Sequence, residues 1–142
     1  MSEFKNFHIS DVLSITTGRL VSSRHIEGVY DILGWMSGES LMTHQLPRVG
    51  EEAEPVLSEK YPHLSKEAMA SDLLELDRLL LEANRDQEKS AAAVRSWVDA
   101  IAAKFGLDFA VPKLNEDQHE RIDPHSELAE KIHPDRIITV RT

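Results

Sequence analysis

Two apolar stripes of helical period constrain the fold of this 142-residue chain more than any other feature of its sequence. Apolar residues recur in both at steps of three and four, which is the spacing of one face of an α-helix. The first stripe consists of Met69, Leu73, Leu76, Leu80 and Ala83, and the second of Val94, Trp97, Val98, Ile101 and Phe105. Because only residues 84–87 connect the two, we expect the helices to pack as an antiparallel hairpin.

Two shorter helices are predicted ahead of the hairpin. Ser10-Asp11 is a favoured helix cap, and Gly18 suits the left-handed position at which such a helix ends. Ser22-Ser23 caps a second apolar stripe that Gly38 closes. Gly28 lies inside this second helix, where a glycine costs about 1 kcal/mol relative to alanine. We therefore expect another part of the backbone to approach closely at Gly28.

The segment between these helices and the hairpin carries apolar residues of helical spacing that are interrupted by Pro47, Gly50 and Pro55. Proline inside a helix removes a hydrogen bond and clashes with the preceding turn. A broken or kinked helix is predicted here. Ser65 then has the position of a cap for the first helix of the hairpin.

A small sheet is expected beside the helices, because Arg136–Arg141 at the end of the chain is rich in β-branched residues. Arg19–Ser22, Lys5–Ile9 and Phe109–Val111 are candidate partners in a sheet of two or three strands. A further helix is predicted to open at Asp123-Pro124. The whole chain, residues 1–142, reads as one mainly α domain, with an α+β domain as the alternative.

The charge and cysteine content exclude several classes of protein. Sixteen basic residues against 25 acidic ones give a net charge of −9, which opposes general binding to nucleic-acid backbones. The chain has no cysteine, so it has neither disulfides nor thiolate metal sites. No apolar run is long enough for a membrane span. These features predict a soluble cytoplasmic protein with no cofactor.

Two polar clusters suggest a binding site for a small anionic ligand such as a nucleotide. Guanidinium groups and the free N–H groups at helix starts both bind oxyanions, provided that the fold brings them together. The candidate residues are Thr17, Arg19, Arg24, His44, Gln45 and Arg48. In the alternative interpretation these side chains cap helices, and the arginines form exposed ion pairs with nearby carboxylates.

A dense group of glutamates suggests a surface for a basic partner. It comprises Glu51, Glu52, Glu54 and Glu59, and an ordinary solvated helix face is the alternative. A third polar cluster, His119–His125, lacks the thiols and the His-Glu-x-x-His pattern of zinc sites. We predict that it is a solvated loop without a metal. No catalytic motif is found, so the sequence does not predict an enzyme.

Three segments resemble an uncharacterised family of small proteins from phages, prophages and other bacterial mobile elements. They are Phe7–Leu20, Arg24–Leu33 and Thr43–Arg48. The resemblance implies an accessory protein of a mobile element and carries no catalytic residues over. We hypothesise that the protein binds a host or phage macromolecule and inhibits a defence system, in the manner of an anti-CRISPR protein. An unpaired C-terminal strand would in addition allow a homodimer.

Overall fold

The computed structural model describes residues 3–122, which form five α-helices, two short 3₁₀ turns and a two-stranded sheet. The elements are β1 (Phe4–His8), α1 (Ile9–Thr17), α2 (Ile26–Ser37), a 3₁₀ turn (Thr43–Gln45), α3 (Leu46–Lys60), a 3₁₀ turn (Pro62–Leu64), α4 (Ala70–Ala83), α5 (Gln87–Phe105) and β2 (Asp108–Pro112). The prediction of a mainly helical chain with a small sheet is confirmed. None of the helices in this part of the chain has the length and apolar character needed to cross a membrane.

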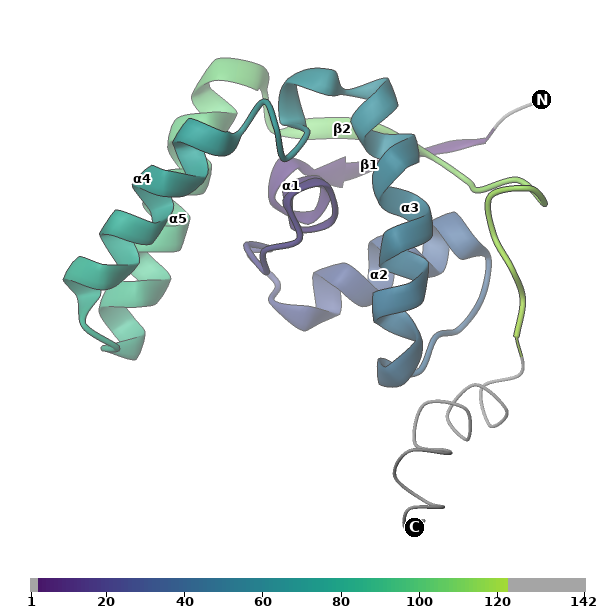
Figure 1. The fold of residues 1–142 in the computed structure, drawn as a ribbon, viewed down its shortest axis with the longest axis horizontal. Helices are drawn as coiled ribbons and strands as arrows, with labels where there is room; N and C mark the ends of the chain where they lie inside the picture. Colours follow the sequence, from purple (N-terminus) through teal and green to yellow (C-terminus); the bar gives the residue numbers. More distant parts are fainter. Residues whose placement is uncertain (1–2, 123–142) are drawn as a thin grey trace, which may run out of the picture.

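The predicted hairpin is α4 followed by α5, which extends to one side of a body made by α1, α2, α3 and the sheet (Figure 1). Asn84 takes the left-handed conformation that ends α4, and Asp86 caps α5 by accepting a hydrogen bond from the Lys89 amide. The indole of Trp97 donates to the carbonyl of Asp72 at 2.7 Å. Nearly all residues of the two stripes are buried or half-buried where the helices meet, with Phe105 as the exposed exception.

The sheet pairs two of the three candidate strands. β1 and β2 are antiparallel, with Phe7 opposite Phe109. Arg19–Ser22 is not a strand, because α1 side chains occupy its backbone amides: the Val21 amide donates to Ser14 Oγ at 3.0 Å. The predicted strand Arg136–Arg141 and the predicted helix from Asp123 lie outside the described residues.

Helix α1 lies at the centre of the body, and all nine of its residues are buried. The carboxylate of Asp11 is 1% exposed and accepts hydrogen bonds from Ser22 Oγ at 2.5 Å and from Arg24 at 3.0 Å. A Cβ atom at Gly28 would overlap both Asp11 Oδ1 and Ser22 Oγ. The close approach predicted at this glycine is therefore real, but side chains rather than a backbone make it.

Four predicted helix boundaries differ from the structure. Helix α1 begins at Ile9, and its cap is His8, which accepts from the Ser10 amide, rather than Ser10 or Asp11. Helix α2 begins at Ile26, after a turn in which Ser22 Oγ accepts from the Arg24 amide. Helix α3 runs unbroken through Pro55, and the predicted interruption falls instead at the 3₁₀ turn before it. Ser65 caps only a preliminary turn, by accepting from the Ala68 amide, and α4 begins at Ala70.

Candidate functional site

The glutamates of the predicted acidic surface do not share one face of α3. Glu51 and Glu54 border a hollow between α1, α2 and α3, whereas the side chain of Glu52 packs against the loop that follows β2. Glu59 is exposed near the C-terminal end of α3 and borders neither feature. The continuous acidic patch suggested by the sequence is therefore split between two sides of one helix, which follows from the 100° rotation per residue of an α-helix.

We call the hollow beside Glu51 and Glu54 the acidic groove; its volume is about 620 Å³. Its walls come from the C-terminal end of α1, from α2, from the first half of α3 and from Lys66 and Glu67. Apolar side chains form most of these walls: Ile15, Leu20, Ile26, Val29, Leu33 and Leu46. Leu20 and Ile26 are 54% and 44% exposed, so this apolar surface is open to a ligand.

The charge around the groove is predominantly negative. Glu51, Glu54 and Glu67 line it, with Lys66 as the single basic side chain among the lining residues of the described chain. Glu54 accepts a hydrogen bond from Ser58. Glu51 and Glu67 make no side-chain hydrogen bond or ion pair within residues 3–122. Carboxylates placed in this way favour a cationic group on whatever enters the groove.

Thr16 also lines the groove and carries an unusual hydroxyl. Its side chain is 1% exposed, and its Oγ1 has no hydrogen-bond partner among the described residues. The neighbouring Thr17 differs, because its Oγ1 donates to the Leu13 carbonyl at 2.6 Å. A buried polar atom without a partner is uncommon in folded proteins.

The six residues predicted to bind an anion do not converge. Only Thr17 lines the acidic groove, and the three arginines form separate ion pairs with carboxylates. Arg19 pairs with Asp77 at 2.6 Å, and Arg24 pairs with Asp11 and Asp31. The hydrogen bonds that the Arg24 guanidinium donates to Asp11, and to a lesser extent to Asp31, raise its pKa. With more acidic than basic residues in the chain, each of these arginines finds a carboxylate close by.

The two other members of that set lie on the 3₁₀ turn before α3. The Gln45 carbonyl oxygen accepts from the Met42 amide at 2.9 Å, and its side-chain amide donates to the Ile122 carbonyl at 3.4 Å. His44 is half-buried on the same turn. The Gln45 side chain is therefore placed by local and loop contacts, and neither residue lines the acidic groove.

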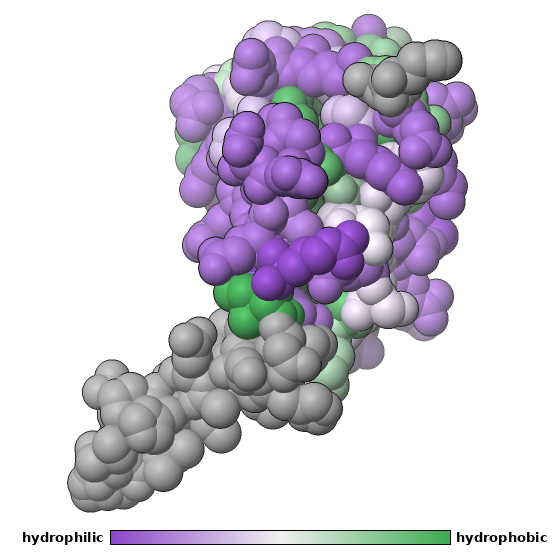
Figure 2. All heavy atoms as spheres, turned by 90° about the vertical axis from the view of Figure 1, so that its right-hand side faces the viewer, coloured by the Kyte–Doolittle hydropathy of each residue, from purple (hydrophilic) through white to green (hydrophobic). Residues whose placement is uncertain are grey.

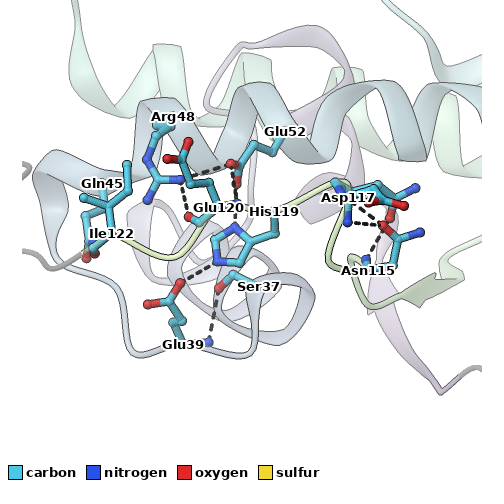
Figure 3. A network of polar contacts seen from close by, with 11 residues as sticks. Ser37, Glu39, Gln45, Arg48, Glu52, Asn115, Asp117, His119, Glu120 and Ile122 are labelled. Carbon is cyan, nitrogen blue, oxygen red and sulfur yellow. Dashed lines mark hydrogen bonds and ion pairs between the residues drawn. The ribbon is translucent and has the colours of Figure 1, made fainter.

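His119, from the polar cluster that the sequence predicts to be a solvated loop, is buried and connects the loop after β2 to α3 (Figure 3). The His119 side chain is 5% exposed; its Nδ1 lies 2.6 Å from Glu52 Oε1, and its Nε2 bonds to Glu39. Arg48 completes the network by pairing with Glu52 at 3.0 Å and donating to the Glu120 carbonyl at 2.6 Å. We call these side chains the His119 latch. The prediction of a solvated loop is wrong for His119.

The latch has the chemistry of a structural clamp. A neutral imidazole donates from one nitrogen only, so its bonds to two carboxylates require the doubly protonated ring or a protonated carboxyl group. Both ring nitrogens are occupied, and no group of three or more acidic, histidine or cysteine side chains in the described chain is arranged to hold a metal ion. The partners lie 67 and 80 residues from His119 in sequence, so no local spacing could have revealed them.

The face shown in Figure 2 is largely hydrophilic, with apolar side chains in small groups. The acidic groove combines exposed apolar walls with carboxylates.

Fold and site together define a small, mainly helical domain with an acidic, apolar-walled groove. A family model described as "Domain of unknown function (DUF7736)" matches residues 7–67, less than half of the chain. No curated protein and no solved structure matches the chain. Every residue lining the acidic groove lies within the matched segment, so the similarity to this family covers the complete groove.

Proposed function

We propose that the protein is a non-enzymatic binding protein that holds a basic, partly apolar segment of another protein in the acidic groove. The observation that carries this proposal is that exposed apolar side chains and carboxylates line the same hollow. The apolar residues are Leu20 and Ile26, and the carboxylates are those of Glu51, Glu54 and Glu67. Apolar contact supplies affinity at roughly 25 cal/mol per Å² of buried apolar surface. The carboxylates raise the association rate of a basic partner and select against acidic ones.

We propose a nucleic-acid-binding component of a bacterial defence system as the partner. Proteins of that kind carry basic surfaces, which match the net charge of −9 and the three carboxylates of the groove. The resemblance of the N-terminal third to proteins of mobile elements supports the same class of partner. The anionic-ligand site proposed for Arg19, Arg24 and Arg48 has less support, because each of these guanidiniums already bonds to carboxylates.

A pull-down from host lysate with matched charge variants tests the proposal. The double variant Glu51→Lys/Glu54→Lys reverses the charge at the groove, and Glu59→Lys reverses one charge elsewhere on the same helix. We expect a protein that the wild type and the Glu59→Lys variant capture at low salt and that the double variant does not capture. Ile26→Ser should weaken capture as well, because it removes an exposed apolar wall. Equal capture by the wild type and the double variant would contradict the proposal.

A further inference from the structure

A second hollow, of about 470 Å³, lies between the segment that leads into α2 and the N-terminal half of α5. We call it the arginine pocket, because Arg85 and Arg95 line it. His8 and His25 line it as well, and Asp99 is its one carboxylate among the described residues. This concentration of basic side chains stands out in a chain of net charge −9.

The two arginines differ from the others in their pairing. Arg19, Arg24 and Arg78 each form an ion pair with at least one carboxylate, and so does Arg48. Arg121 donates a hydrogen bond to the Gly38 carbonyl at 3.5 Å. Arg85 and Arg95 make no ion pair or side-chain hydrogen bond within residues 3–122, even though acidic residues are in excess. Their guanidinium groups are thus available to an anion from outside the chain.

The backbone at the pocket is held in unusual conformations. Three non-glycine residues of the described chain have positive φ angles, and two of them, His25 at 57° and Arg85 at 66°, line this pocket. Residues that carry a Cβ atom rarely adopt positive φ angles, and strained backbone of this kind is found most often at functional sites. The strain is consistent with a pocket whose basic groups are placed for a ligand.

The other residues that line the pocket indicate which chemical groups a ligand would carry. Val94 and Val98 supply apolar surface, whereas Ser23 and Ser90 bring hydroxyl groups. The volume lies within the range of roughly 300–1,000 Å³ that small-molecule sites occupy. Two guanidinium forks match the oxygens of a phosphate group, and the apolar wall suits a ring or other apolar body.

We propose that the arginine pocket binds a phosphate monoester of nucleotide size, with the phosphate at Arg85 and Arg95 and the apolar or ring portion against Val94 and Val98. The residues of α5 that line the pocket lie outside the segment that matches the family model. The proposed site therefore needs both the matched body and the α4–α5 hairpin. The site shares none of the six residues that the sequence suggested for an anion.

Isothermal titration calorimetry at low ionic strength tests this inference with defined probes: adenosine, uridine and guanosine 5′-monophosphates, phenyl phosphate, inorganic phosphate and unphosphorylated adenosine. We expect at least one monoester to bind, and to bind at least tenfold more tightly than inorganic phosphate or adenosine. The double variant Arg85→Gln/Arg95→Gln should bind that ester at least tenfold more weakly. Both side chains are on exposed residues, so circular dichroism should show an unchanged fold.

Arg78→Gln is the matched control, since Arg78 lies on α4 outside the pocket and pairs with Glu75 and Glu82. This variant should bind the ester as the wild type does. The assignment is overturned if no monoester binds, if inorganic phosphate binds as tightly as the best ester, or if the double variant keeps its affinity. Equal losses in Arg78→Gln and the double variant would likewise overturn it, because they would show an effect of net charge alone.

Discussion

At the scale of single residues, Gly28 is the glycine with the least room for a side chain. The substitution Gly28→Ala would push a methyl group into Asp11 and Ser22, whose hydrogen bond is buried. Overpacking and a disturbed charged hydrogen bond each cost about 1–3 kcal/mol, so we expect a loss of about 3 kcal/mol in the free energy of unfolding. Urea denaturation measures this loss.

Gly50→Ala is the matched control for that prediction. A Cβ at Gly50, inside α3, would meet only Leu33 Cδ1 at 3.9 Å, which is ordinary contact. Alanine is the better helix former by about 1 kcal/mol, so this variant should be slightly more stable than the wild type. If Gly28→Ala proved as stable as Gly50→Ala, the packing described around Asp11 would be incorrect.

Tyr61 gives a prediction about pH. Burial raises the pKa of its hydroxyl, and the hydrogen bond that this hydroxyl donates to the Ala110 carbonyl at 2.8 Å favours the same neutral form. A raised pKa in the folded state favours the neutral phenol, so its contribution to stability is complete below the unfolded value of about 10. That contribution disappears as the pH rises through the folded pKa.

The phenolate absorbance of the wild type minus that of the Tyr61→Phe variant reports the titration of Tyr61 alone. We expect a midpoint above about 10, the ordinary value for tyrosine. A midpoint at or below that value would show that this hydroxyl is not desolvated between α3 and β2.

At the scale of elements, the His119 latch fixes the loop that leads away from β2. The substitution His119→Ala removes the hydrogen-bond partner of Glu39, whereas Glu52 loses one partner and keeps Arg48 and the Glu120 amide. We expect a loss of about 1–3 kcal/mol in the free energy of unfolding, the usual cost of unsatisfied buried groups. Amide hydrogen exchange should also become faster at Glu120, whose amide donates to Glu52.

Glu116→Ala is the control in the same loop, because Glu116 is exposed and its side chain makes no hydrogen bond or ion pair within the described residues. Its exchange rates and stability should match those of the wild type. Unchanged exchange at Glu120 in the His119→Ala variant would mean that other contacts hold the loop.

The helices were predictable because their signals are local. The stripe containing Met69, Leu73 and Leu76 needs only the period of a helix, and the connection over 84–87 needs only its length to specify a hairpin. The prediction of a strand at Arg19–Ser22 was wrong. Side chains of α1 accept hydrogen bonds from backbone amides in and next to this segment, and the β-propensity of its residues carries no information about such contacts. The strands that do pair were among the candidates, but their register depends on contacts across the fold.

The candidate site was predictable only in part. Glu51 and Glu54 belong to the acidic group that the sequence indicates, but the apolar walls that form a groove beside them come from α1 and α2. Arg19 and Arg24 form ion pairs, as in the alternative interpretation of the sequence, and their partners Asp77 and Asp11 lie 58 and 13 residues away. Long-range pairing of this kind is set by the tertiary structure, which no spacing along the chain encodes.

At the scale of the whole molecule, two hollows of opposite charge share one residue. Leu20 lines both the acidic groove and the arginine pocket, whereas Ile26 lines the groove alone. Loss of about 1 kcal/mol of apolar contact corresponds to about fivefold weaker binding. Leu20→Ser should therefore weaken the binding of the captured protein and the binding of the phosphate ester by about fivefold each. Ile26→Ser should weaken only the binding of the protein.

Titration of both ligands against the two variants checks this expectation. If Leu20→Ser left both affinities unchanged, the wall between the two hollows would have no part in binding. A loss of ester binding in Ile26→Ser would contradict the separation of the two sites.

The most direct test of the central claim is site-specific photo-crosslinking in host cells. A photoreactive p-benzoyl-phenylalanine in place of Glu51 or Glu54 lies at the acidic groove, and one in place of Glu82 lies on exposed α4. The account predicts that the same host protein is crosslinked from positions 51 and 54 and is absent at position 82. Crosslinking of a partner from position 82, with none from positions 51 and 54, would contradict the acidic groove as the binding site.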